Sequence, residues 1–402
     1  MPIYKWEGKT AKGAVKKGEM EAPGEAAIRI HLRQQNIIPT KISSKGKEIR
    51  ISLPFFKQKV KQRSVAVFTR QLATMIDAGL PLVQSLDILS SQQENKVFKN
   101  VIRQIKEDVE GGSTFAGALT KHPSAFNELF TNLVVAGEEG GILDNILNRL
   151  ASYIEKSEAL KKKVKSALIY PATIIGVAVI VVMILMIFVI PVFESMFKSA
   201  GQSLPLPTLI VLTMSKLIKK YVLIFIPAFV LLIYLFKKYY QTQSGRAVVD
   251  SLLLKLPVIG MLLKKIAVAR FSRTLGTLVS SGVPILDGLS IVSRTSGNKT
   301  IETAILNARA SIREGETIAD PLSRSGIFPP MVIQMIAVGE STGALDSMLS
   351  KIAEFYEEEV DVAVANLTSL LEPFLMMFLG VVIGGVVIAM YLPIFNMSSA
   401  IG

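Results

Sequence analysis

Two short stretches of the chain carry carboxylates in the same pattern. Residues 135 to 147 are VAGEEGGILDNIL, and residues 337 to 349 are AVGESTGALDSML. The shared pattern G-E-x-x-G-x-L-D-x-x-L repeats one glutamate and one aspartate at a fixed spacing: Glu138 and Asp144 in the first copy, Glu340 and Asp346 in the second. Carboxylate oxygens are the ligands that hard divalent cations prefer. One hypothesis for each copy is therefore a divalent-ion site.

The same glutamates also fit two further hypotheses. In the first copy we expect a helix to end at FTNLVVAGEE, with Gly141 in the left-handed conformation that ends many helices, and Gly343 takes the same place in the second copy. A glutamate in the last helical turn faces the negative end of the helix dipole, which costs roughly 0.3 to 1 kcal/mol. A salt bridge inside the protein would offset that cost, and the duplicated Arg70 and Arg273 are the candidate partners. Contact with a partner protein is the third hypothesis.

Little else in the sequence is suited to catalysis. Cysteine is absent, and the only histidines are His31 and His122, so thiolate metal sites and His-based catalysis have little to work with. The segment GKT at 8 to 10 resembles the end of a phosphate-binding loop, but Ile3 stands where that loop needs glycine, and no G-x-S-x-G elbow is present. We therefore expect no catalytic residue, no cofactor and no enzyme activity, and any ATP that drives the protein is hydrolysed elsewhere.

The glutamate motif belongs to a longer internal repeat. The segment FTRQLATMIDAGLPLVQSLDIL at 68 to 89 aligns with FSRTLGTLVSSGVPILDGLSIV at 271 to 292, with eight of 22 positions identical and no gap. Each half is therefore about 110 residues of one helical design that ends in a membrane helix.

Local signals place turns inside each copy. Apolar residues at helical spacing follow Ser64, a candidate N-cap. A glycine at C′ and a proline at N1 would then end one helix and begin the next; these pairs are Gly79 with Pro81, and Gly282 with Pro284. Further helices are expected at about 95 to 110, 113 to 121 and 125 to 139, followed by a long helix from residue 142.

Three apolar segments are candidates for membrane crossings. Residues 166 to 193 and 373 to 402 contain no charged side chain, and each exceeds the roughly 20 apolar residues that span a bilayer core. Residues 221 to 236 form a shorter candidate, with lysines at both ends that can snorkel. If both repeats share a compartment, their trailing helices cross in the same direction, so the middle segment must return the chain. The lysine-rich segment 161 to 165 and the polar start place the repeats and the N-terminus in the cytoplasm and the C-terminus outside.

These observations predict a mainly α-helical membrane protein with two homologous cytoplasmic helical bundles, three transmembrane helices and a small N-terminal α/β module. The predicted parts are the α/β module at 1–50, a basic linker at 51–63, bundle 1 at 64–168, a first crossing at 169–193, a short periplasmic segment at 194–217, a second crossing at 218–237, bundle 2 with its connector at 238–371, a third crossing at 372–395 and a periplasmic tail at 396–402.

The third crossing carries small residues at a spacing that lets transmembrane helices approach closely. They are Gly380, Gly384, Gly385 and Ala389. We expect them to pack against another helix, within the chain or across a dimer.

The charge balance is basic. A formal net charge of +13 could favour nucleic acid, anionic lipid or an acidic protein. Cytoplasmic flanks of membrane proteins are rich in Lys and Arg, so we expect contact with membrane lipid and no nucleic-acid partner. The apolar runs contain no ionisable side chain of the kind that a transporter or proton path usually needs. A channel or transporter, and a passive membrane receptor, are the rival classes.

The sequence resembles the inner-membrane platform proteins of type IV pilus assembly and type II secretion, the PilC and GspF family. The resemblance rests on the duplicated 22-residue segments, the duplicated VAGEEGG and VGESTG, the spans that begin YPA and EPF, and the opening YKWEGKTAKG. The YKWEG opening and the YLPIFNMSSAIG ending look more like the pilus branch than the secretion branch.

The resemblance implies a non-enzymatic, multi-pass protein of the bacterial inner membrane that forms homo-oligomers, with a dimer favoured. It also implies partners: a hexameric pilus assembly ATPase in the cytoplasm, a retraction ATPase as a further candidate, pilin subunits, and other inner-membrane alignment proteins. We expect motion of the ATPase to displace the two bundles, and the long helices that follow them to carry this motion to the bilayer.

Overall fold

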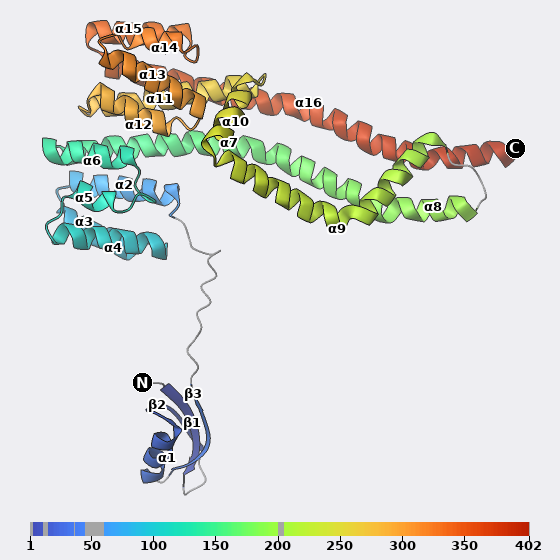
Figure 1. The fold of residues 1–402 in the computed structure, drawn as a ribbon, viewed down its shortest axis with the longest axis horizontal. Coiled ribbons are helices and arrows are strands. Elements are labelled where there is room, and N and C mark those ends of the chain that lie inside the picture. Colours follow the sequence, from blue (N-terminus) through green and yellow to red (C-terminus); the bar gives the residue numbers. More distant parts are fainter. Residues whose placement is uncertain (1–2, 11–14, 36, 45–59, 200–204, 402) are drawn as a thin grey trace. The chain divides into compact units, whose positions relative to one another are not determined.

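The computed structural model describes residues 3–10, 15–35, 37–44, 60–199 and 205–401. The chain divides into two compact units, Met1–Lys59 and Val60–Gly402. Each unit is described by itself below (Figure 1). Of the predicted basic linker at 51–63, residues 51–59 lie outside the described residues and residues 60–63 lie within them.

The first unit is a small antiparallel sheet with one helix. Its strands β1 (Ile3–Thr10), β2 (Val15–Glu21) and β3 (Ile37–Ser44) are arranged in the order β2-β1-β3. Helix α1 (Glu25–Gln34) buries Ile28 and Leu32 completely, together with Ala22 and Ile37. Side chains at i and i+4 lie on one helix face, so this spacing gives α1 the apolar side that covers the sheet. The unit agrees with the predicted α/β module.

The second unit contains the two predicted helical bundles. Bundle 1 consists of α2 (Gln62–Asp77), α3 (Leu82–Gln92), α4 (Lys96–Glu110), α5 (Phe115–Thr120), α6 (Glu128–Gly140) and the first part of α7 (Leu143–Ile184). Bundle 2 consists, in the same order, of α11 (Ile259–Ser280), α12 (Ile285–Thr295), α13 (Lys299–Arg313), α14 (Ala319–Arg324), α15 (Pro330–Thr342) and the first part of α16 (Leu345–Ile401). The repeat in sequence is therefore a repeat of six helices.

The start of bundle 1 differs from the prediction. Helix α2 begins at Gln62, after Lys61 in an extended conformation, so Ser64 lies inside the helix and is not its N-cap. Gln62 and Arg63 are good helix formers, and they extend the helix past the serine.

Large aromatic side chains fill the centre of bundle 1. The rings of Phe68 and Phe98 have centroids 5.5 Å apart, and those of Phe126 and Phe130 lie 4.7 Å apart. In bundle 2, Phe271 keeps one such contact, 4.7 Å from Phe328. Tilted and edge-on ring pairs of this kind add stability beyond the burial of their area.

The two bundles contact each other along α7. The hydroxyl groups of Tyr153 on α7 and Thr274 on α11 are 3.2 Å apart, and burial raises the pKa of Tyr153. Further along, Lys163 of α7 pairs with Asp361 of α16. One hydrophobic core cluster runs through both bundles. The bundles are therefore packed together as one body.

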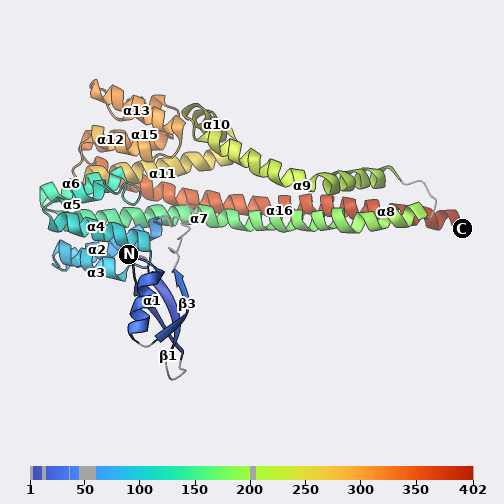
Figure 2. The same ribbon diagram turned by 60° about the horizontal axis from the view of Figure 1, so that its bottom comes forward.

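Two long helices leave the bundles. Helix α7 continues through a π-helical turn, η2 (Leu185–Val189), into α8 (Ile190–Ser199). Figure 2 shows α7 and α16 side by side. Among the described residues, Leu143–Ser195 and Leu345–Leu392 are the helices long and apolar enough to cross a membrane. The first of these helices contains the predicted first crossing at 169–193, and the second contains the predicted third crossing, 372–395, as far as Leu392.

A third long helix connects the bundles. Helix α9 (Leu206–Tyr240) is followed by α10 (Gln243–Lys255), which leads into bundle 2. The predicted periplasmic segment at 194–217 and the second crossing at 218–237 do not correspond to separate elements, because α9 is helical from Leu206 onward. Its first turns pack against η2 and α16, where the Thr208 hydroxyl donates to the Ala389 carbonyl oxygen at 2.5 Å.

Candidate functional site

The duplicated glutamate caps a short helix in each bundle. In bundle 1 the carboxylate of Glu138 accepts hydrogen bonds from the backbone N–H groups of Phe115 at 2.6 Å and Ala116 at 2.8 Å. The next N–H group, of Gly117, donates to the Thr114 side chain at 3.0 Å. The first N–H groups of a helix have no partner inside the helix, so Glu138 and Thr114 together satisfy the start of α5.

Bundle 2 repeats this arrangement with small changes. Both carboxylate oxygens of Glu340 lie 2.9 Å from the backbone nitrogen of Ile318, at the start of α14. The Thr317 hydroxyl oxygen accepts from the N–H of Asp320 at 3.4 Å. In bundle 2 the glutamate therefore binds one N–H group, whereas Glu138 binds two.

This contact shows how a glutamate is tolerated in the last turn of a helix. The negative end of the α6 dipole disfavours Glu138, but the positive end of the α5 dipole lies at its carboxylate. Helix N-termini bind anions through these two features, aligned N–H groups and the dipole. Glu138 is thus an internal anion bound by α5, and it ties α5 to the end of α6.

The glycines of the motif let the chain turn tightly beside the glutamate. Gly141 ends α6 with φ +66° and Gly343 ends α15 with φ +73°, as predicted from the sequence. Gly137 has a different role: a Cβ there would come within 3.0 Å of Ile146 on α7. A Cβ at Gly339 would come equally close to Leu345 and Met348. These glycines therefore allow the last turn of one helix to approach the start of the long helix.

The predicted salt bridge between the arginines and the motif glutamates is wrong. Arg70 forms a bidentate pair with Glu155 of α7, at 2.8 Å and 2.6 Å, and this hydrogen bonding lowers the pKa of Glu155. Arg273 forms the equivalent pair with Glu357 of α16, at 2.8 Å and 2.9 Å. The carboxylates of Glu138 and Glu340 are bound by backbone N–H groups and not by the arginines. The arginines tie the first helix of each bundle to its long helix instead.

The geometry does not favour the divalent-ion hypothesis. The Glu138 oxygens are already used by N–H groups, and Asp144 lies in the first turn of α7, where a negative charge suits the helix dipole. Asp346 has the same position in α16. Across the described residues, no group of three or more potential metal-ligating side chains is found.

The predicted glycine and proline turns are present in both copies. Gly79 and Gly282 both have φ +82°. Pro81 and Pro284 lie at the N-cap of α3 and α12, one position before the predicted N1. The extended ψ of each proline, 141° and 139°, keeps it just outside the helix.

The small residues of the third crossing divide into two groups. Among the atoms that the structure describes, a Cβ at Gly380, Gly384 or Gly385 would meet no heavy atom within 4 Å, so the described side chains leave these glycines open. Ala389 is buried and contacts α9 through the hydrogen bond from Thr208. Packing of the glycines across a dimer stays a prediction.

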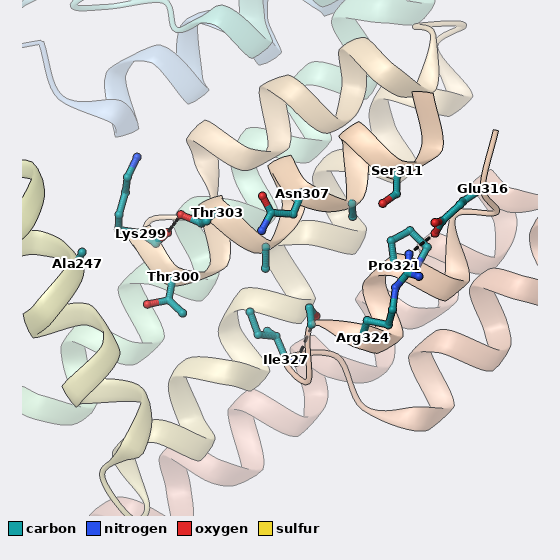
Figure 3. Close-up of a pocket in the computed structure, with 13 residues that line it drawn as sticks. Ala247, Lys299, Thr300, Thr303, Asn307, Ser311, Glu316, Pro321, Arg324 and Ile327 are labelled. Carbon is teal, nitrogen blue, oxygen red and sulfur yellow. Dashed lines mark hydrogen bonds and ion pairs between the residues drawn. The ribbon is translucent and has the colours of Figure 1, made fainter. Parts of the chain in front are cut away.

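A cavity of about 670 Å³, lined by both polar and apolar side chains, opens on bundle 2 (Figure 3). It is lined from α13 by Lys299, Thr303 and Asn307, from α14 by Arg324, and from α10 by Ala247. Helix α10 precedes the six helices that bundle 2 shares with bundle 1, so one side of this cavity lies outside the repeated unit. Its lining contains hydroxyls, an amide and the ion-paired side chains of Lys299, Glu316 and Arg324.

Sequence reasoning missed four residues that hold the site together. They are Thr114, Thr317, Glu155 and Glu357. A signal was present, because each pair occupies equivalent positions in the two repeats. The equivalent partners of Arg70 and Arg273 were therefore visible as duplicated glutamates farther along the chain.

The fold and the site define a membrane protein of two equivalent helical bundles, each with an internal glutamate cap and an arginine–glutamate pair that joins it to a helix extending into an apolar span. A family model described as "Type II secretion system (T2SS), protein F" matches residues 68–191 and 271–393, and one for the N-terminal domain of that protein matches residues 1–43. The chain belongs to this family.

The chain is similar over nearly its whole length to curated members from both branches of the family. It is 51% identical to the type IV pilus assembly protein PilC of Myxococcus xanthus, covering 99% of this chain and 95% of that protein. It is 42% identical to the type IV pilus assembly protein TapC of Aeromonas hydrophila, covering 99% and 96%. It is 36% identical to the type II secretion system protein F of Xanthomonas campestris, covering 100% of both.

Family membership confirms the resemblance seen in the sequence. The two matched segments of the main model correspond to the two halves of the internal repeat. The chain is an inner-membrane protein of a family of assembly proteins, and it is not an enzyme.

Proposed function

We propose that this chain is the inner-membrane platform of a type IV pilus assembly machine. In this role it receives the movement of a cytoplasmic assembly ATPase and passes it to the bilayer, where pilin subunits join the filament. The observation that carries the proposal is the continuity of α7 and α16. Each begins in a bundle, at Leu143 or Leu345, and continues without a loop into an apolar span.

A continuous helix is a suitable transmitter of movement. Helix α16 has 57 residues, which at 1.5 Å per residue gives a rod about 85 Å long. The Arg273–Glu357 pair fixes α11 to this rod, and Glu340 fixes α14 to the turn in front of it. In bundle 1 the Arg70–Glu155 pair fixes α2 to α7, and Glu138 fixes α5 to the last turn of α6, directly before α7. A displacement of either bundle would therefore move the helix that follows it.

The proposed topology has three crossings. Both bundles lie at the same end of α7 and α16, and α9 connects that region with the far end of α7 (Figure 1). This arrangement supports a return through residues 218–237 of α9. The N-terminal unit and both bundles would then lie in the cytoplasm and the C-terminus in the periplasm.

The partners proposed for the platform follow from this role. They are a hexameric assembly ATPase and a retraction ATPase on the cytoplasmic side, pilin subunits and alignment proteins in the membrane, and a second copy of the chain. Gly380, Gly384 and Gly385 are the proposed contact with the second copy, because they are open to a neighbouring helix.

Site-specific photo-crosslinking tests the proposal. Gln104 on α4 and Asn307 on α13 are exposed and hold equivalent positions in the two bundles, whereas Thr213 on α9 lies at the opposite end. With a photoreactive residue at each position in turn, Gln104 or Asn307 should yield an adduct with the assembly ATPase, and Thr213 should not. An adduct only at Thr213 would refute the proposal.

A type II secretion platform is the second candidate, because the family model and some relatives carry that name. Deletion of the gene in its host separates the two. Loss of pili with normal secretion is expected, and loss of secretion with normal pili would favour the second candidate.

A further inference from the structure

The turn between α10 and α11 exposes apolar side chains next to the bundle surface. This apolar elbow comprises Leu256, Val258, Ile259 and Met261, which are between 39% and 65% exposed. Val248 and Leu252 continue the exposed apolar surface along α10. A contiguous exposed apolar surface outside the apolar spans marks an interaction site.

The backbone holds the elbow in a constrained shape. Val258 has φ +68° and ψ −59°, and the N–H of Ile259 donates to the carbonyl oxygen of Pro257 at 2.8 Å. These values define a γ-turn, a strained conformation that β-branched residues rarely adopt. Val258 is the one non-glycine with positive φ in the described part of the chain. Strained backbone of this kind clusters at functional sites.

Two ion pairs show which residues of α7 and α16 lie beside the start of α11, and so where the elbow lies along these long helices. Lys265 of α11 pairs with Glu359 of α16 at 2.6 Å, and Lys163 of α7 pairs with Asp361 of α16. From Lys265 back to Ile259, α11 rises about 9 Å in the direction of the apolar spans. A move of about 9 Å along α16 from Glu359 toward its apolar span passes Asp361, which pairs with Lys163 of α7. The same level on α7 lies just after Lys165, the last charged residue before the apolar run. The elbow therefore lies level with the start of the first apolar span.

The charges around the elbow are basic. Lys237 and Lys238 lie in the last turn of α9, Lys255 ends α10, and Lys264 lies in the first turns of α11; all four are exposed. The carboxylate of Asp250 points inward, where it accepts from the Tyr240 hydroxyl at 2.9 Å and from the N–H of Lys299 at 2.7 Å. These bonds fix α10 to the end of α9 and to bundle 2.

We propose that the apolar elbow inserts into the cytoplasmic leaflet at the boundary between headgroups and acyl chains, and that the surrounding lysines bind anionic headgroups. An apolar tip flanked by lysines is the composition of membrane-surface segments. The elbow then holds bundle 2 against the bilayer and sets the position from which the bundle moves. This inference rests on α7 and α16 crossing the membrane, as in the proposed function.

A fluorescent probe at the elbow tests this inference. The chain has no cysteine, so Met261→Cys in the full-length protein gives one site for an environment-sensitive dye. The labelled protein is placed in nanodiscs that contain anionic lipid and spin-labelled quencher lipid. Val338→Cys, on the exposed surface of α15, is the matched control, and Val179→Cys in the apolar part of α7 reports membrane insertion.

The expected result is dye emission at Met261→Cys that is shifted to shorter wavelength and is quenched most by a shallow spin label. Val338→Cys should show neither effect. Val179→Cys should be quenched most by a deep label, and failure there would contradict the membrane crossing itself. Lys255→Glu with Lys264→Glu should reduce the shift at Met261→Cys.

Two outcomes would overturn the inference while leaving the proposed function intact. In the first, Met261→Cys behaves like Val338→Cys although Val179→Cys is quenched. In the second, the emission at Met261→Cys shifts without lipid quenching and only as the protein concentration rises, which would assign the elbow to contact with a second copy.

Discussion

The cap that Glu138 forms on α5 can be tested by removing its charge. Glu138→Gln keeps one acceptor oxygen and replaces the other with an N–H₂ group, so one of the two bonds to Phe115 and Ala116 is lost. A hydrogen bond to a charged group contributes about 1.5 to 3 kcal/mol, and these two backbone groups belong to buried residues. Since 1.4 kcal/mol is a factor of ten, opening of α5 should become roughly ten- to a hundredfold more frequent.

Hydrogen–deuterium exchange of the full-length protein measures this opening directly. Amides at the start of α5 should exchange faster in Glu138→Gln by about that factor, while α4 should change little. Glu139→Gln is the matched control, because Glu139 is exposed and lies one residue away. Glu340→Gln should have a smaller effect, less than about tenfold, because Glu340 binds one N–H group and the remaining oxygen can keep that bond.

A particular result would refute the assignment of the cap. If Arg70→Ala accelerated exchange at α5 and Glu138→Gln did not, the glutamate would be paired with the arginine after all. A double-mutant cycle between Arg70 and Glu138 should give a coupling energy near zero, because both side chains have other partners.

Three further predictions concern the contacts around the motif. Gly137→Ala should destabilise the protein by about 1 to 3 kcal/mol, because the added Cβ forces α6 away from α7. Gly140→Ala is the control and should be close to neutral, because a Cβ there makes only ordinary contacts. Thermal unfolding in detergent measures both variants. Arg273→Ala should lower the free energy of unfolding by about 2 kcal/mol and Arg70→Ala by less than about 1 kcal/mol, because the Arg273 side chain is 13% exposed and that of Arg70 is 39% exposed. Equal losses of stability would contradict the claim that burial strengthens the Arg273 pair. Because Arg70 lowers the pKa of Glu155, the ionised carboxylate stabilises the folded protein fully above the ordinary glutamate pKa of 4.5, and this stabilisation is lost as the pH falls through the lowered pKa. Glu155→Gln should therefore remove this part of the loss of stability in acid. Unfolding measured across this pH range checks the prediction.

The architecture was predictable because it depends on patterns that repeat in the sequence. Apolar residues at helical spacing, such as those around Phe68 and Phe271, specify which face of each helix is buried. The left-handed glycines Gly141 and Gly343 were predictable because few other residues adopt that conformation. The apolar runs of α7 and α16 needed only length and composition.

The partner of Glu138 was not predictable in the same way. Its hydrogen-bond donors are backbone N–H groups, which every residue except proline carries, so no residue type marks them. Arg70 and Arg273 are duplicated in the same way as the glutamates, so they were a more visible choice of partner than the backbone at the start of α5. The duplication of Glu155 and Glu357 was visible in the sequence, but choosing them as the partners of the arginines requires the packing of α2 against α7, which local sequence does not encode. The apolar elbow lies outside the repeat, so no second copy indicated its importance.

The transfer of movement from the bundles into the membrane through α7 and α16 is tested most directly by interrupting one of these helices. A short run of glycines inserted in α7 after Lys165 would uncouple bundle 1 from its span without altering the bundle. The same run inserted between Gln93 and Glu94, in the turn between α3 and α4, is the control. We expect the α7 insertion to abolish pilus assembly while the crosslink from Gln104 to the ATPase remains, and we expect the control to assemble pili. Normal piliation with the glycine run in α7 would contradict this mechanism.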